Sequence, residues 1–320
     1  MGKTGRYNAQ MFSSAAHRPF WLSPYLLLTL TVLFWSGNWV IGRAAVGSVP
    51  PVALAFWRWS LAVLFMLPLA LPQMRRDWPG ILAQWKVIVG LGVLGMGYHN
   101  VFSYLGLQYT TATNGVMLNS SIPIFIIALG WLFFGQRITR LQLLGVGISL
   151  AGVVAILARG ELAVLASLKL NPGDLILLGA MMQWALYTLA LKWRPEGISA
   201  LAFLCTCSII GVIAMMPAYA IEFAAGKSIH WSWPVAGALA YVGLFPSFLG
   251  YIFWNRGVHE VGPSVAGLFV HLMPVFGSLL AWLFLDERLY WFHLLGLVLI
   301  LSGIVLTTRK GTLVPPVPAD

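Results

Sequence analysis

Residues 274–288 read PVFGSLLAWLFLDER, and residues 123–137 read PIFIIALGWLFFGQR. The two stretches are 151 positions apart, and their match continues beyond them. Identical pairs include Pro123/Pro274, Trp131/Trp282, Arg137/Arg288, Gly145/Gly296 and Gly152/Gly303. Because proline, tryptophan, glycine and arginine all align, shared hydrophobicity alone does not explain the match. The chain therefore contains an internal repeat.

The composition is that of an all-α integral membrane protein. Of the 320 residues, 59% are hydrophobic and only 9% are charged, whereas a soluble domain carries about 25% charge. Apolar runs of about 20 residues, the length that a bilayer requires, recur along the chain. The net charge of +10 comes from basic residues spread between these runs, which indicates cytoplasmic loops and no nucleic-acid partner. Cys205 and Cys207 lie inside an apolar run, where packing is their expected role.

Hydropathy predicts ten spans and two tails. The tails, 1–23 and 309–320, are expected to be cytoplasmic, with the first span acting as an uncleaved anchor. The spans cover about 24–43, 51–71, 86–107, 112–135, 141–159, 173–192, 199–221, 234–256, 262–285 and 290–308.

The distribution of positive charge predicts that both termini are cytoplasmic. Most of the 19 Lys and Arg residues then lie in cytoplasmic segments, as the positive-inside rule requires. The repeat gives two five-helix halves, 24–159 and 173–308, and an odd number of spans inverts the second half relative to the first. The repeated loop agrees with this inversion: GQRITR (135–140) carries two arginines and no acid, and LDERLYW (285–291) carries two acids.

Several stretches together resemble the drug/metabolite transporter superfamily in its ten-helix form with two EamA-type domains. They are WSGNWVIGRAAV (35–46), PPVALAFWRW (50–59), GLQYTTATNG (106–115), the two stretches quoted first, and GDLILLGAMMQWALYTL (173–189). The resemblance covers about residues 24–308. The family usually has a glutamate at the end of the fourth span as well as the ninth, and Gln136 stands at the first of these positions. Inverted repeats of this kind favour a solute site at their interface, near the bilayer midplane.

The first and sixth spans carry matching stripes of aromatic and polar residues. Trp35, Asn38 and Trp39 lie on one helical face, and Trp184 and Tyr187 lie on the equivalent face of the sixth span. These residues are predicted to line a cavity that stacks against and hydrogen-bonds a small solute. Interfacial aromatics with a packing role are the alternative interpretation.

The third and eighth spans supply further polar candidates. The third contains Tyr98, His99, Asn100, Ser103 and Tyr104. Of these, Tyr98, His99 and Asn100 are predicted to bind substrate, together with Tyr251 and Asn255 of the eighth span. His99 can bind a carboxylate or hydroxyl or change protonation during transport. A neutral histidine bonded across helices is the alternative.

Pro123 and Pro274 are predicted to kink the fourth and ninth spans. Each proline removes a helical hydrogen bond and frees the carbonyl four residues earlier, which for Pro123 is that of Asn119. Ser120 and His271 stand three residues before the two prolines. These positions are predicted to present polar atoms near the midplane.

Arg58, inside the second span, has three possible roles. It can snorkel, bond backbone carbonyls, or contact a substrate anion. Its place in the stretch PPVALAFWRW favours a structural role.

Together these features predict a secondary transporter of small, neutral or zwitterionic metabolites that uses alternating access. The resemblance implies export of amino acids or their derivatives across a bacterial inner membrane. No cofactor or metal is expected, and the sequence allows a monomer. Two alternatives remain open: a lipid flippase or scramblase, and an intramembrane enzyme that uses His99 and His271 as bases.

Overall fold

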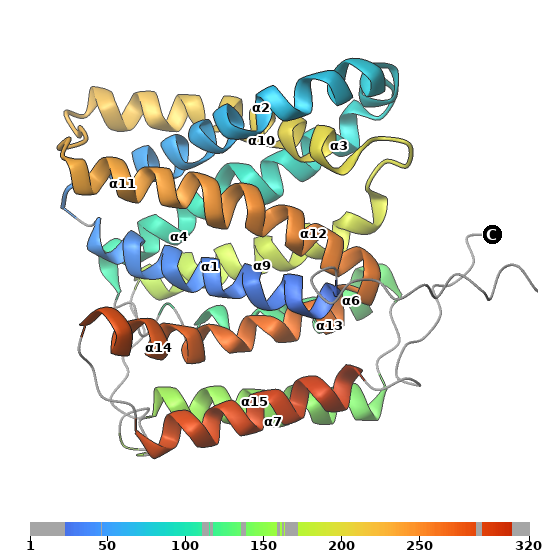
Figure 1. The fold of residues 1–320 in the computed structure, drawn as a ribbon, viewed down its shortest axis with the longest axis vertical. Helices are drawn as coiled ribbons and strands as arrows, with labels where there is room; N and C mark the ends of the chain where they lie inside the picture. The colour runs from blue at the N-terminus through green and yellow to red at the C-terminus, as the bar shows by residue number, and fades with distance from the viewer. Residues whose placement is uncertain are drawn as a thin grey trace, which may run out of the picture.

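A computed structural model of the chain describes residues 23–45, 47–110, 115, 118–135, 139–158, 161, 163, 172–285 and 290–308. These residues form helices, with no strand among them (Figure 1). The α-helices are α1 (Pro24–Ala44), α2 (Pro51–Ala83), α3 (Trp85–Gly92), α4 (Tyr98–Tyr109), α6 (Ile122–Phe134), α7 (Arg140–Leu157), α9 (Pro172–Ala190), α10 (Ala200–Ala224), α11 (Trp233–Val242), α12 (Gly250–Val261), α13 (Pro263–Leu268), α14 (Met273–Leu285) and α15 (Trp291–Thr308). The predicted tails, except for Ser23, and the residues Gln136, Arg137, Asp286, Glu287 and Arg288 lie outside the described residues.

The prediction of an all-helical membrane protein is confirmed. Seven helical segments in the described residues are long and apolar enough to cross a membrane, and three shorter apolar helices follow the same order along the chain as the remaining predicted spans. The predicted second span ends too early, because α2 continues to Ala83. Pro68, Pro72 and Pro79 all lie on the exposed side of this helix, so their missing N–H groups do not disturb the buried face.

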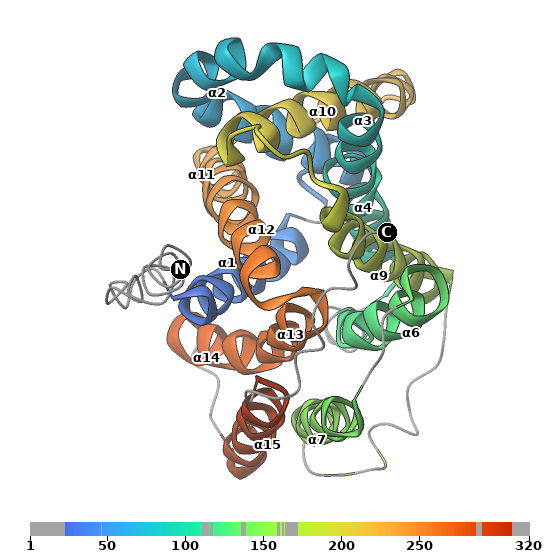
Figure 2. The same cartoon turned by 90° about the vertical axis from the view of Figure 1, so that its right-hand side faces the viewer.

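The repeat appears in the packing of α7 against α15. These helices form one edge of the molecule, below the others in Figure 1 and Figure 2. A Cβ on Gly145 would lie 2.8 Å from the carbonyl oxygen of Gly303, and a Cβ on Gly152 would lie 2.7 Å from that of Gly296. Since Gly145 and Gly152 are the repeat mates of Gly296 and Gly303, the two close contacts exchange under the pseudo-two-fold axis. Glycines let the two backbones approach this closely.

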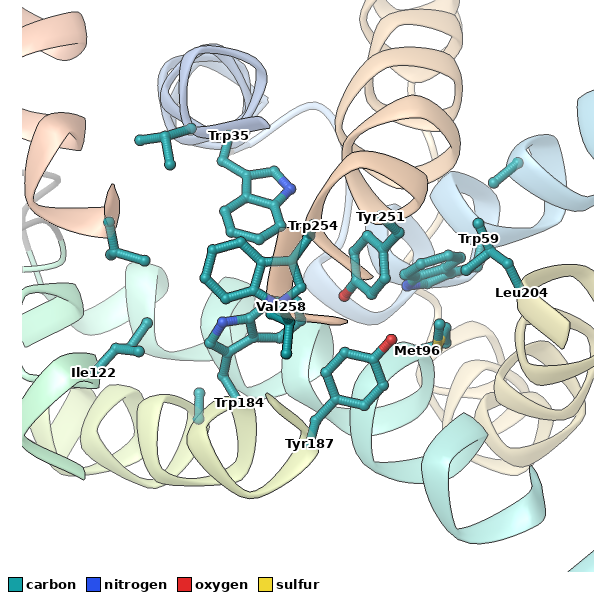
Figure 3. Close-up of a cluster of buried hydrophobic side chains, with 14 of the residues drawn as sticks. Trp35, Trp59, Met96, Ile122, Trp184, Tyr187, Leu204, Tyr251, Trp254 and Val258 are labelled. Atoms are coloured by element: carbon teal, nitrogen blue, oxygen red, sulfur yellow. The ribbon is translucent and has the colours of Figure 1, made fainter. Parts of the chain in front are cut away.

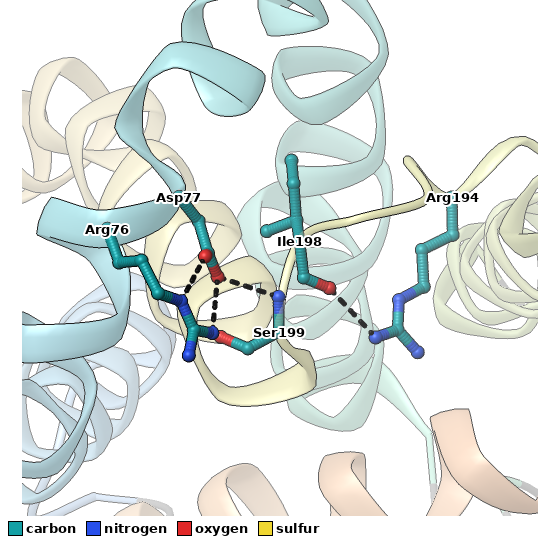
Figure 4. A network of polar contacts seen from close by, with 5 residues as sticks. All are labelled: Arg76, Asp77, Arg194, Ile198 and Ser199. Atoms are coloured by element: carbon teal, nitrogen blue, oxygen red, sulfur yellow. Dashed lines mark hydrogen bonds and ion pairs between the residues drawn. The ribbon is translucent and has the colours of Figure 1, made fainter.

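At the opposite edge, α2 and α10 run antiparallel and cap one another. Glu222, near the end of α10, accepts hydrogen bonds from the backbone N–H groups of Val52 and Ala53 at 3.2 and 2.7 Å. Asp77 of α2 accepts a 2.8 Å bond from the N–H of Ser199, which precedes α10 (Figure 4). Helix N-termini expose N–H groups that need acceptors. Each helix therefore supplies the carboxylate that accepts from the N-terminal N–H groups of the other helix. Arg76 also forms an ion pair with Asp77 at 2.8 Å.

Two short π-helices interrupt equivalent helices of the two halves. The segment η2 (Val93–Gly97) joins α3 to α4, and η4 (Gly243–Leu249) joins α11 to α12. Such wide turns leave backbone carbonyls without intrahelical partners. Trp35 donates to the carbonyl of Pro246 at 3.1 Å, and Tyr251 donates to that of Gly95 at 2.8 Å. Aromatic side chains from the centre of the bundle therefore satisfy both π-helices.

The two prolines interrupt their spans more completely than a kink would. Pro123 lies in the first turn of α6, after a turn at 120–121. Pro274 lies in the first turn of α14, after the 3₁₀ segment η5 (Phe269–Leu272). Proline is tolerated at these positions because the first N–H groups of a helix have no intrahelical partner.

Candidate substrate cavity

A cavity lies among the helices at the centre of the bundle. Its walls come from α1, α2, α4, α6, α9, α12, η5 and α14, together with Asn119 ahead of α6. The lining residues are Trp35, Asn38, Trp39, Arg58, His99, Asn100, Ser103, Tyr104, Leu107, Asn119, Ile122, Trp184, Tyr251, Val270 and Met273. The volume open to the centre of a water molecule is about 40 Å³. This is enough space for a few water molecules.

Aromatic side chains make up one wall of the cavity. The rings of Trp35 and Trp184 meet edge to face with centroids 5.0 Å apart, and Tyr251 lies 5.3 Å from Trp184. Trp254 packs behind them, 5.0 Å from Trp35. Figure 3 shows these rings turned toward one another from three different helices. Such a wall offers a large apolar contact surface together with indole N–H donors.

Arg58 supplies the positive charge of the cavity. The side chain is only 2% exposed. Its Nε donates to Ser247, and its Nη1 donates to Oδ1 of Asn38 at 3.0 Å and to the hydroxyl of Tyr104 at 3.1 Å. Tyr104 in turn donates to the same Asn38 oxygen at 2.8 Å. These neutral partners fix the guanidinium in the cavity wall.

The pair Asn38–Tyr104 has a counterpart in the other half. Tyr187 of α9 donates to Oδ1 of Asn255 in α12 at 2.8 Å. In the repeat, Asn38 is the mate of Tyr187 and Tyr104 is the mate of Asn255, so the two residue types are exchanged across the pseudo-two-fold axis. The first pair lines the cavity. The second does not, and Tyr187 is fully buried.

His99 lies in the cavity wall with one ring nitrogen occupied. Its Nδ1 is 2.9 Å from the carbonyl oxygen of Ala180. A carbonyl accepts only, so Nδ1 carries a proton, and in the neutral ring Nε2 is an acceptor. The ring also packs 5.1 Å from that of Trp184.

Two buried donors in the cavity wall have no hydrogen-bond partner in the part of the chain that the structure describes. They are Nδ2 of Asn100 and Nε1 of Trp184, and both side chains are more than nine-tenths buried. Buried polar groups in folded proteins are nearly always hydrogen-bonded. These two donors therefore have no acceptor within reach in this structure.

The structure does not bring five of the predicted residues to the cavity. They are Tyr98, Ser120, Tyr187, Asn255 and His271. Tyr98 donates to the carbonyl of Ala214 at 2.8 Å, and His271 lies between Ser149 Oγ at 2.6 Å and the carbonyl of Ser120 at 3.1 Å. Both ring nitrogens of His271 are thus occupied by protein groups.

The predicted list omitted six lining residues. They are Ser103, Tyr104, Leu107, Ile122, Val270 and Met273. Three of them could have been found from helical spacing, because Asn100, Ser103, Tyr104 and Leu107 follow one another at i, i+3, i+4 and i+7 on a single face. Ser247, the partner of Arg58, gave no signal, since hydropathy does not show the π-helix that places it.

The described residues include no group of three or more His, Cys, Asp or Glu that could hold a metal ion. The lining set also has no carboxylate. The acids that the structure does describe lie near helix ends or in connections: Asp77, Glu161, Asp174, Glu196, Glu222 and Glu260.

Comparison with known proteins identifies a family whose members resemble this chain over most of its length. The model of the EamA-like transporter family matches residues 22–158 and, a second time, residues 171–309. A relative from Archaeoglobus fulgidus, described as an uncharacterized transporter, is 29% identical over 291 residues, which is 89% of this chain and 97% of that protein. A probable terminal-alkyne amino-acid exporter from Streptantibioticus cattleyicolor is 24% identical over 88% of this chain and 92% of its own. One solved crystal structure has the same fold, with a TM-score of 0.69 and 17% identity, over 89% of this chain and 96% of that one.

Proposed function

The chain belongs to the EamA-like transporter family, and from this premise we propose that it exports amino acids or closely related metabolites by alternating access at the central cavity. The coarser statement is established by the family: the protein is a multi-pass membrane transporter of small molecules. The proposal concerns the cargo, the direction and the mechanism.

The observation that carries the proposal is the chemistry of the cavity. Tryptophan rings lie beside a guanidinium, three asparagine amides and an imidazole. Arg58 lies seven residues from the start of α2, or about 10 Å along its axis, so the polar groups lie well inside the apolar span. Polar groups at that depth in a membrane usually face a pathway. This combination suits a small molecule with both charged and apolar parts.

The charge inventory favours a cargo of low net charge. A phosphorylated sugar would require several basic residues, and the described lining offers only Arg58. The similarity to a probable terminal-alkyne amino-acid exporter agrees with an amino-acid-like cargo. We extend the proposal to a bacterial inner membrane location, with both termini cytoplasmic and the monomer as the transporting unit.

Alternating access is supported by the exchanged Tyr–Asn pairs. In this structure one pair borders the cavity and its repeat mate is sealed in the bundle. In the mechanism that we propose, rocking of the two halves opens the sealed pair, Tyr187–Asn255, and closes the pair Asn38–Tyr104. The cavity would widen during each transition, because its present size holds only a few waters.

Counterflow in proteoliposomes tests the proposal. Vesicles containing the purified chain are loaded with single amino acids, and entry of the labelled compound is followed against empty vesicles. We expect accumulation for at least one amino acid or derivative. Labelled lipid is followed in parallel. Lipid exchange without solute counterflow would overturn the transport proposal in favour of a flippase or scramblase.

A further inference from the structure

We propose that Arg58, Asn100 and Trp184 form a subsite that binds the carboxylate of the transported molecule. This inference rests on the proposed function and goes beyond it, because it assigns one chemical group of the cargo to named residues. The proposed cargo is therefore a monocarboxylate. An otherwise identical amide or amine without the carboxylate is expected to bind poorly.

Arg58 carries a buried positive charge in the cavity wall. Its three protein partners, on Ser247, Asn38 and Tyr104, are neutral oxygens. They satisfy N–H groups without balancing the charge. Among the described residues, ion pairs join Arg76 to Asp77 and Arg256 to Glu260, and none involves Arg58. A buried charge in an apolar medium is unfavourable unless it is paired.

The cavity wall also contains buried N–H donors that lack acceptors. Nδ2 of Asn100 and Nε1 of Trp184 have no hydrogen bond among the described residues. The three hydrogen bonds of Arg58 to Ser247, Asn38 and Tyr104 use its Nε and Nη1 atoms. Arg58, Asn100 and Trp184 line the same cavity. Together they provide N–H groups and one positive charge. A carboxylate has the complementary set, two acceptor oxygens and one negative charge.

The second half of the chain argues against a purely structural role for Arg58. The sequence Ala-Leu-Ala-Phe occurs at 53–56 in α2 and again at 200–203 in α10. Two residues after each copy stand Arg58 and Cys205. Cys205 is fully buried, so the fold builds the same helix with a small neutral residue at this position. The fold of this helix therefore does not require a positive charge at this position, and only the first repeat carries one.

Acceptors lie elsewhere in the lining. Nε2 of neutral His99 is one, because Nδ1 is used on Ala180. Oδ1 of Asn119 is another, because its amide nitrogen contacts the sulfur of Met273. A zwitterion that sets its carboxylate on Arg58 can therefore place its ammonium group toward these acceptors. Apolar parts would then lie against the tryptophan wall.

Matched pairs of ligands test the subsite on the purified full-length chain. The probes are L-leucine with L-leucinamide and L-phenylalanine with L-phenylalaninamide, which differ only at the carboxylate. Binding is measured by thermal shift, and competition by counterflow. We expect the wild type to favour each acid over its amide by about 10- to 100-fold, the range of a hydrogen bond to a charged group. Equal affinity for acid and amide in the wild type would overturn the subsite.

Two variants assign the effect to residues. Arg58→Gln removes the charge and is expected to bring acid and amide within about 3-fold of each other. Asn100→Asp places a competing carboxylate in the lining and is expected to abolish binding of the acids. Arg256→Gln, a partly exposed residue that pairs with Glu260, is the control of equal charge change and should keep the preference. Retention of the full preference in Arg58→Gln would overturn the proposal.

Asn100→Asp decides the question if Arg58→Gln does not fold, since acid binding at wild-type strength in Asn100→Asp also overturns it. Failure of the subsite is distinguishable from failure of the proposed function. Counterflow without a preference for acids removes only the subsite. A preference that depends on Arg58 in the thermal shift, with no counterflow of any solute, removes only the transport proposal.

Discussion

The hydroxyl of Tyr187 in α9 donates a 2.8 Å hydrogen bond to Oδ1 of Asn255 in α12, away from the cavity lining. The equivalent bond of the first half, from Tyr104 to Asn38, borders the cavity and shares its acceptor with Arg58. Each half therefore contains a Tyr–Asn hydrogen bond at equivalent positions, and the two bonds lie in different environments.

Tyr187→Phe should lower stability more than Tyr104→Phe. In the first variant the buried oxygen of Asn255 loses the donor that Tyr187 provides, whereas in the second Asn38 still accepts from Arg58. Hydrogen bonds within membranes are worth about 0.6 to 2 kcal/mol. Thermal unfolding in detergent measures the difference. A larger loss in Tyr104→Phe would contradict the assignment of the two environments.

Glu222→Ala should destabilise the junction of α2 and α10. The substitution leaves the N–H groups of Val52 and Ala53 without their acceptor, and loss of a helix cap costs about 1 kcal/mol. Glu196→Ala is the control, because Glu196 is exposed in the connection before α10. The midpoint of thermal unfolding should fall for Glu222→Ala and stay unchanged for the control. Equal midpoints would show that the cap contributes nothing.

Gly152→Leu should separate α7 from α15. A Cβ at Gly152 would already lie 2.7 Å from the carbonyl oxygen of Gly296 and 2.9 Å from Cβ of Leu299, so a larger side chain forces the helices apart. Overpacking typically costs about 1–3 kcal/mol. Gly147→Leu in the same helix is the matched control, because a Cβ at Gly147 meets nothing within 4 Å. Unfolding in detergent should distinguish the two variants, and similar behaviour would contradict the close packing.

His99 and His271 should respond differently to substitution by glutamine. His99→Gln alters the cavity wall and is expected to lower the counterflow rate about 10-fold or more, with a small change in thermal stability. His271→Gln disturbs bonds to Ser149 and Ser120 and is expected to lower stability by about 1–3 kcal/mol. Thermal unfolding and counterflow are measured on both proteins. A loss of transport at wild-type stability in His271→Gln would assign that histidine to the pathway.

The repeat made much of the fold predictable. Composition gave the helical membrane class, and the aligned glycines anticipated a repeated pair of helices that the structure joins at Gly145–Gly303. The same shift of about 150 residues located the aromatic stripe of Trp35 and Trp184. Such features are predictable because they follow from periodicity and from residue type alone.

Other features depend on three-dimensional context. Hydropathy is similar for an α-helix and a π-helix, so neither the position of Ser247 beside Arg58 nor the carbonyl of Pro246 could be read from the pattern. Tyr104 and Tyr187 are the same residue type at related depths, and only the conformation of the bundle decides which one meets the cavity. The environment of His271 also depends on the packing of the bundle. Its place near a proline indicated a polar site in the cavity, but its ring contacts Ser149 and Ser120, which are distant in the sequence.

The central claim is that solute crosses through the cavity between the two halves. A single cysteine at Ser103, in a background where Cys205 and Cys207 are replaced by alanine, places a reactive group in the lining. Ala225→Cys, exposed in the connection between α10 and α11, is the control. Each protein is labelled with a bulky maleimide, and counterflow of the transported amino acid is measured before and after. The account predicts that complete labelling at position 103 abolishes counterflow while labelling at 225 leaves it intact. Undiminished counterflow through fully labelled Ser103→Cys protein would contradict it.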